Sequence, residues 1–172
     1  MRGPSQSFLR STLPFWLLAA AAAAVLGAIH AHRLPLAELR GDEATYVAMA
    51  SSLARDGDLD FEAADARWAR ERGGAALILE RTGRGVSYSK PVLFPLLAAP
   101  FLALAGEAGL ILFNALALGL ALLLARALLA RVAPAGRATE ALLTFAFASA
   151  LVPYVVWRMA ETLQVALAIA AC

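Results

Sequence analysis

The chain has 172 residues, of which 61% are hydrophobic and 16% are charged, and its formal net charge at pH 7 is +2. Soluble domains are usually about 45–50% apolar, so this composition predicts an integral membrane protein. The positive charge is too small and too dispersed to favour nucleic acid as a partner, and a single cysteine excludes an internal disulfide.

The predicted elements begin with an uncharged apolar stretch over 13–29, which follows Arg2 and Arg10. A spanning helix needs about 20 residues, so this stretch is just long enough for a first span, and a cleaved signal sequence is the alternative. Hydropathy predicts further spans at about 109–129, 138–157 and 162–172. The last of these stops within an apolar run, so we expect 1–172 to be the amino-terminal part of a larger membrane domain.

The arginines predict how these spans are oriented. They gather before the first span and between the next two, at Arg2, Arg10, Arg126, Arg131 and Arg137. Because positive residues favour the cytoplasmic side, the pattern predicts a multi-pass protein of the inner (plasma) membrane with a cytoplasmic amino terminus and an extracytoplasmic loop over 30–108. The predicted fold class is all-α, with polytopic transmembrane helices and a helical first outer loop. Within that loop, the proline-broken apolar stretch 91–104 suits an interfacial or re-entrant element.

The clearest local structure in the loop begins at Asp42. Aspartate is a favoured helix N-cap, apolar residues follow at helical spacing, and Gly57 stands where a helix would end. This pattern predicts an amphipathic helix from Asp42 to Asp56 near the membrane surface. Asp42 either caps this helix or takes part in chemistry. Glu43 faces another direction, so the two carboxylates are not expected to act as a dyad.

Four segments occur in a particular order along the chain: Gly41-Asp42-Glu43-Ala44-Thr45-Tyr46, Arg55-Asp56-Gly57-Asp58-Leu59-Asp60, Tyr88-Ser89-Lys90-Pro91 and Leu96-Leu97-Ala98-Ala99-Pro100-Phe101. With the hydropathy between them, they resemble the first outer loop of polyprenyl-phosphate-sugar-dependent glycosyltransferases of the GT-C fold. That superfamily includes the aminoarabinose transferases acting on lipid A and the protein mannosyltransferases. The resemblance extends from the first apolar stretch to the region of Tyr154 to Glu161.

The resemblance implies sugar transfer at the outer face of the membrane, from a polyprenyl-phosphate donor to a hydroxyl of a lipid, glycan or protein acceptor. It implies that Asp42 takes the proton from the acceptor, so that attack at the anomeric carbon expels polyprenyl phosphate with inversion. Glu43 would position Asp42 or an ion, and a divalent cation is compatible with this role. The sequence specifies neither the sugar nor the acceptor.

Four more residues are predicted to bind substrate, each with a structural alternative. Lys90, the single lysine, suits the donor phosphate or an anchor at the lipid headgroups. Tyr88 either stacks on a sugar or belongs to the aromatic belt at the interface. Arg158 and Glu161, three residues apart, form either a local ion pair or part of the site.

No cofactor or metal site is predicted from the residues themselves. Asp56, Asp58 and Asp60 alternate as in a calcium loop, but Phe61 occupies the position that requires glycine. The segment Gly83-Arg84-Gly85 is not expected to lie between a strand and a helix, as a nucleotide-binding loop would.

Two alternatives come from other classes of protein. A polytopic transporter would place ionisable residues inside its spans, whereas most charges here lie near the predicted span ends. A non-enzymatic membrane scaffold, with the outer loop as a binding cap, fits the hydropathy equally well. Replacing Asp42 would distinguish an enzyme, which loses turnover, from a scaffold, which does not.

Overall fold

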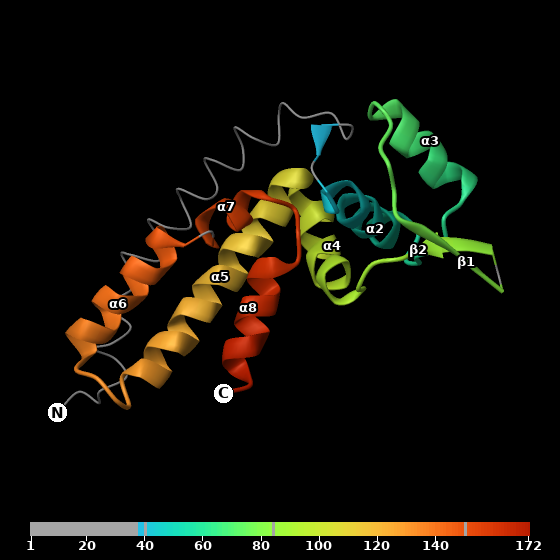
Figure 1. Ribbon diagram of the computed structural model, residues 1–172. Helices are drawn as coiled ribbons and strands as arrows, with labels where there is room; N and C mark the ends of the chain where they lie inside the picture. The colour runs from blue at the N-terminus through green and yellow to red at the C-terminus, as the bar shows by residue number, and fades with distance from the viewer. Residues whose placement is uncertain (1–37, 40, 84, 150) are drawn as a thin grey trace.

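A computed structural model describes residues 38–39, 41–83, 85–149 and 151–172. These residues form seven α-helices and one two-stranded antiparallel sheet (Figure 1). The elements are α2 (Glu43–Arg55), α3 (Ala63–Glu71), β1 (Leu79–Thr82), β2 (Gly85–Tyr88), α4 (Leu93–Ala105), α5 (Glu107–Leu129), α6 (Ala135–Ala148), α7 (Leu151–Val156) and α8 (Glu161–Ala170).

The polytopic transmembrane fold predicted from hydropathy is wrong for the described part of the chain. There, α5 is the one helix long and apolar enough to cross a membrane. The expected span at 138–157 is divided, because α6 ends at Ala148, Ser149 has extended backbone angles and α7 begins at Leu151. The ten residues of α8 rise about 15 Å, roughly half of the hydrocarbon core. The expected span at 13–29 lies outside the described residues, as do Arg2 and Arg10.

The outer loop is also not purely helical, because it contains the hairpin of β1 and β2. Leu79 lies opposite Tyr88 and Thr82 lies opposite Gly85. Gly85 has a φ of 151°, a conformation that side chains rarely permit, so a glycine suits the turn between the strands. A strand therefore does precede the Gly83 to Gly85 turn, contrary to the prediction, but a strand rather than a helix follows it.

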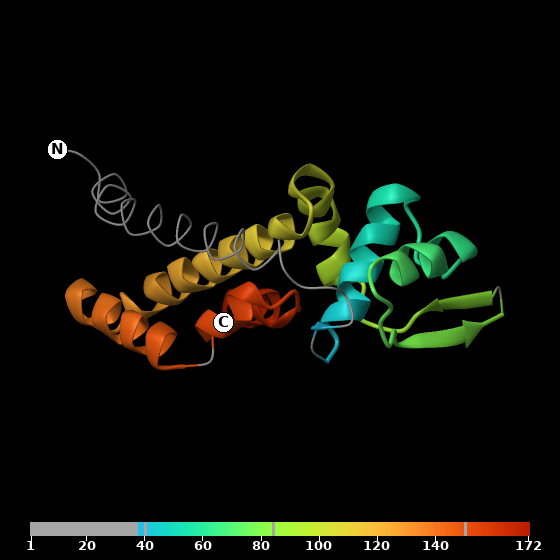
Figure 2. The same cartoon turned by 90° about the horizontal axis from the view of Figure 1, so that it is seen from above.

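Helix α5 is the central element of the fold. It packs against α8, α4, α7 and α6, while α2 packs against α4 and α3. Figure 2 shows an elongated arrangement, with α6 toward one end and the hairpin at the other. At the α4–α5 turn, Gly109 lies directly against the backbone of Phe101, where a Cβ atom would collide with it. The absence of a side chain there lets the two helices approach closely.

The predicted bounds of helix α2 are confirmed, but its predicted environment is not. Asp42 is the N-cap, the helix ends at Arg55, and Gly57 follows with a φ of 82°. However, all ten residues from 43 to 52 are buried, so the predicted amphipathic character of this helix is wrong. The reason is tertiary, because α4 and α3 pack against the helix, and Tyr46, Met49 and Phe94 belong to one apolar core.

Candidate functional site

The candidate site is centred on an ion pair between Asp42 and Lys90, which are 48 residues apart in the chain. The Lys90 Nζ atom lies 2.5 Å from the Asp42 Oδ2 atom. Among the described residues, the Asp42 side chain makes no capping hydrogen bond to α2, although it occupies the N-cap position. The Asp42 side chain therefore does not act as a simple helix cap, which was one of its two predicted roles.

The hairpin brings Lys90 to the start of α2. The backbone N–H of Ile78, just before β1, donates a hydrogen bond to the Thr45 hydroxyl in the first turn of α2, at 3.0 Å. The N–H of Ser89 in turn donates to the carbonyl of Ile78 at 3.0 Å. Because Ser89 directly precedes Lys90, these two bonds fix the backbone next to the lysine beside the helix terminus.

Both members of the pair keep some access to solvent. The Asp42 side chain is 35% exposed and the Lys90 side chain is 20% exposed. A substrate can therefore reach both groups, while their surroundings partly exclude water. This combination suits proton transfer and phosphate binding better than a fully exposed surface pair does.

Tyr46 interacts electrostatically with the Asp42–Lys90 pair and with Glu161. Burial raises the pKa of Tyr46; the Lys90 ammonium opposes this shift, and the carboxylates of Asp42 and Glu161 add to it. The Tyr46 hydroxyl therefore stays a neutral hydrogen-bonding group at pH 7. Glu161 was predicted from the sequence as a site residue, but Tyr46 was not. The position of Tyr46, one helical turn after Asp42, could have indicated it.

Glu43 points into the interior instead of joining Asp42. It is 4% exposed, and its Oε1 atom accepts a hydrogen bond of 2.9 Å from the backbone N–H of Arg158. The Arg158 guanidinium is fully buried, with Nη1 3.7 Å from Glu43 Oε1 and Nε 3.0 Å from Glu107 Oε2. The predicted separation of Asp42 and Glu43 into different directions is thus observed.

Arg158 therefore pairs with α2 and α5 instead of forming the local ion pair with Glu161. Burial lowers the pKa of Arg158, and the neighbouring Glu43 carboxylate opposes this effect. The arginine lies where it holds Glu43 and Glu107, away from solvent. A direct contact of Arg158 with substrate stays a prediction.

Tyr88 lies in the core of the loop region. It is 4% exposed, and its ring meets the Phe61 ring edge-on, with 5.6 Å between the centroids. Burial raises the pKa of Tyr88, and the Asp65 carboxylate adds to the shift. Its hydroxyl is buried without a well-formed hydrogen bond among the described residues. Sugar stacking by Tyr88 stays a prediction, as does a place in an aromatic belt.

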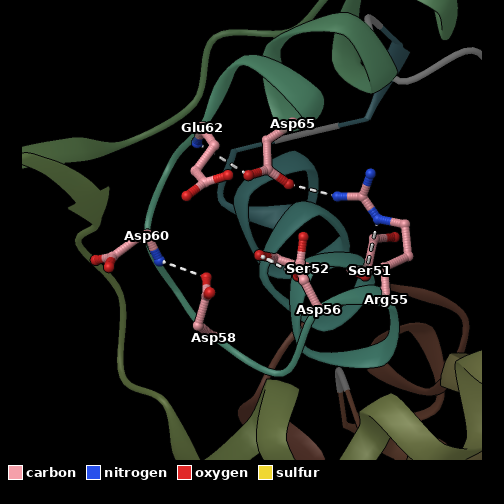
Figure 3. A network of polar contacts seen from close by, with 8 residues as sticks. All are labelled: Ser51, Ser52, Arg55, Asp56, Asp58, Asp60, Glu62 and Asp65. Carbon is pink, nitrogen blue, oxygen red and sulfur yellow. Dashed lines mark hydrogen bonds and ion pairs between the residues drawn. The ribbon is translucent and has the colours of Figure 1, made fainter.

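The acidic segment after α2 is held by local hydrogen bonds (Figure 3). The Ser52 hydroxyl donates to Asp56 at 3.2 Å, and the N–H of Asp60 donates to Asp58 at 3.0 Å. Asp65, in the first turn of α3, accepts hydrogen bonds from Arg55 and from the N–H of the N-cap residue Glu62, so it stabilises the start of α3 and ties that helix to α2. Within the described ranges, no group of three or more His, Cys, Asp or Glu side chains is placed to hold a metal ion.

Comparison with known proteins gives no match: no protein-family model matches the chain, and no curated protein or solved structure is significantly similar to it. The resemblance to glycosyltransferases therefore depends on the four sequence segments alone. The placement of Asp42 beside Lys90 is an independent observation, because these residues belong to different segments.

Proposed function

We propose that this chain transfers a sugar from a polyprenyl-phosphate donor to an acceptor hydroxyl, with inversion at the anomeric carbon. The observation that carries the proposal is the ion pair of Asp42 and Lys90. The reaction needs a base for the acceptor and a cation for the leaving phosphate. The two residues assigned to these roles from separate segments lie 2.5 Å apart and stay accessible.

In the proposed reaction, Asp42 accepts the proton of the acceptor hydroxyl. The acceptor oxygen then forms a bond to the anomeric carbon while the bond from that carbon to the phosphate oxygen breaks. The electron pair of the broken bond leaves with polyprenyl phosphate. The ammonium of Lys90 stabilises the negative charge that develops on this phosphate.

Neighbouring residues support these two roles. Tyr46 offers a neutral hydroxyl that interacts electrostatically with both charges and with the Glu161 carboxylate. Glu43 acts through the backbone, because its bond to the N–H of Arg158 joins the start of α2 to the segment before α8. A polyprenyl donor also requires lipid, and α5 is the described helix whose length and apolarity suit a membrane.

The test is a transfer assay on the protein in detergent with a panel of radiolabelled polyprenyl-phosphate sugars. We expect the wild-type chain to release polyprenyl phosphate, and Asp42→Asn to do so at least about 100-fold more slowly. Asp60→Asn is the matched control, because it makes the same chemical change at an exposed position. Equal turnover by Asp42→Asn would remove this residue from the mechanism. Failure of the wild type with every donor would contradict the proposed function and favour a scaffold.

A further inference from the structure

A cavity lies between the end of α2, helix α3 and the turn that joins α4 to α5. Its volume is about 160 Å³, and its walls include Ser51, Arg55, Trp68, Arg72, Leu102 and Glu107. An apolar cavity of about 150 Å³ can bind benzene in another protein, so this volume is sufficient for one six-membered ring. The side chains of Arg55 and Arg72 in its wall are 36% and 38% exposed, so a ligand can reach the cavity from solvent.

The charges around the cavity compensate one another. Arg55 forms an ion pair with Asp65, and Arg72 forms one with Glu107. A free anion would therefore have to compete with a carboxylate already bound to each guanidinium. A neutral ligand meets no such competition, and it can use the remaining guanidinium N–H groups as donors and the Ser51 hydroxyl as a donor or acceptor.

The cavity also has an apolar part, formed by the Trp68 ring and the Leu102 side chain. The guanidinium carbons of Arg55 and Arg72 lie 5.6 Å and 5.2 Å from the centroid of the Trp68 ring. Such cation–π contacts hold the Trp68 ring in place and bring guanidinium N–H groups close to its carbon surface. The walls thus combine hydrogen-bonding groups with carbon surface in one small space.

We propose that this cavity binds the neutral pyranose ring of a saccharide. A pyranose has hydroxyl groups around its edge and C–H groups on its faces, which match the polar and apolar parts of the walls. Arg55 follows Asp42 by thirteen residues on α2, which corresponds to about 20 Å along the helix. The cavity is therefore separate from the Asp42–Lys90 pair, and the inference does not depend on the proposed transferase activity.

The experiment uses the full chain in detergent and follows the fluorescence of Trp68. The chain has three tryptophans, so Trp16→Phe and Trp157→Phe leave Trp68 as the single reporter. We expect a saturable fluorescence change with methyl pyranosides. Leu102→Phe, which fills the cavity without removing a charge, should weaken binding at least about tenfold. Arg70→Ala is the control on the same helix, because Arg70 is exposed and does not line the cavity.

The same titration by saturation-transfer NMR on the wild-type chain removes any dependence on the tryptophan replacements. Comparing the binding of free monosaccharides with that of methyl glycosides shows whether the cavity prefers a free sugar or the end of a glycan. Absence of saturable pyranoside binding in the folded wild type would overturn the proposal. Unchanged binding by folded Leu102→Phe would also overturn it, as would tighter binding of inorganic phosphate or a uronic acid than of the neutral pyranosides.

Discussion

Lys90 and Asp42 make an ion pair that is partly open to solvent, so the pair contributes little to the free energy of unfolding. Exposed pairs contribute about 0–1 kcal/mol, so we predict that Lys90→Met lowers the free energy of unfolding by about 1 kcal/mol or less. Sugar transfer should suffer more, because the leaving phosphate loses its cation. We expect kcat/KM for the polyprenyl-phosphate donor to fall about 100-fold, measured beside chemical denaturation.

Lys90→Arg is the matched variant, because it keeps the positive charge but changes its shape. It should retain more activity than Lys90→Met. If Lys90→Met transferred sugar at the wild-type rate while remaining folded, the lysine would be only a structural partner of Asp42.

The buried hydroxyl of Tyr88 predicts a specific response to alkali. Its pKa is raised above the ordinary value of 10.0, chiefly by burial, so the folded chain holds this proton more tightly than the unfolded chain. The group therefore contributes stability below pH 10 that is lost as the pH rises toward the folded pKa. We predict that Tyr88→Phe loses less stability above pH 10 than the wild type, as measured by denaturation at a series of pH values.

At neutral pH, Tyr88→Phe should change the free energy of unfolding little, because it removes a buried hydroxyl that lacks a well-formed hydrogen bond. Tyr154→Phe, in α7, provides a comparison with a tyrosine that is less buried. An alkaline stability curve for Tyr88→Phe that matched the wild-type curve would contradict the assigned origin of the effect.

At the scale of elements, the contact between α4 and α5 depends on one glycine. A Cβ atom at Gly109 would collide with the backbone of Phe101, which cannot move aside as a flexible side chain can. We predict that Gly109→Ala destabilises the chain by about 1–3 kcal/mol, although alanine is the better helix former. Thermal or chemical denaturation measures the change.

Gly136→Ala in α6 is the control for Gly109→Ala, since no atom of the described residues outside its own stretch of helix lies within 4 Å of the place that its Cβ would take. It should leave stability unchanged or raise it slightly, by about 1 kcal/mol at most. Equal effects of the two replacements would show that the close approach of α4 and α5 does not limit stability.

The sequence predicted the elements that depend on local signals. Asp42 and Gly57 marked the two ends of α2 closely, although the Asp42 side chain pairs with Lys90 and makes no capping hydrogen bond. The hairpin had a local signal too, since a glycine-rich turn between β-forming residues favours paired strands. The prediction for that turn concerned only a nucleotide-binding loop and did not include the strand before it.

The break between α6 and α7 has only a weak local signal, Ser149, whose hydroxyl accepts a hydrogen bond of 3.3 Å from the N–H of Leu151. The break between α7 and α8 was predicted from hydropathy, but the tertiary hydrogen bonds that hold it were not. The Asn114 amide in α5 donates to the carbonyl of Trp157 at 2.5 Å, just after α7. Its oxygen accepts from the Thr162 hydroxyl at 2.8 Å, in the first turn of α8. These bonds fix the non-helical segment between α7 and α8, and hydropathy averages do not detect them.

The pairing of Asp42 with Lys90 likewise could not be derived from spacing, because the hairpin and its bond to Thr45 create it. The sequence could identify both residues through the resemblance, but not their 2.5 Å contact. Burial was harder still to predict. Glu43 is an interior residue because it contacts the fully buried Arg158, which is 115 residues away in the chain, and no local pattern indicates this contact.

At the scale of the whole molecule, a network of charges centred on the buried Arg158 joins elements that are distant in sequence. Arg158 contacts Glu43 at the start of α2 and Glu107 at the start of α5, and Glu107 also pairs with Arg72 at the end of α3. These contacts connect the candidate site at one end of α2 to the cavity near its other end. The stability of both sites should therefore depend on Arg158.

Removing one member of a buried charge network leaves its partners uncompensated, which typically costs about 3–5 kcal/mol. We predict a loss of this size for Arg158→Leu, measured by chemical denaturation, because the fully buried guanidinium faces the carboxylates of Glu43 and Glu107. Adding Glu43→Gln to Arg158→Leu should recover part of the loss, since it removes one uncompensated charge. Arg131→Leu, at an exposed position after α5, should change stability by less than about 0.5 kcal/mol. A loss for Arg158→Leu as small as that of Arg131→Leu would contradict the network, because it would mean that the buried carboxylates do not require the arginine.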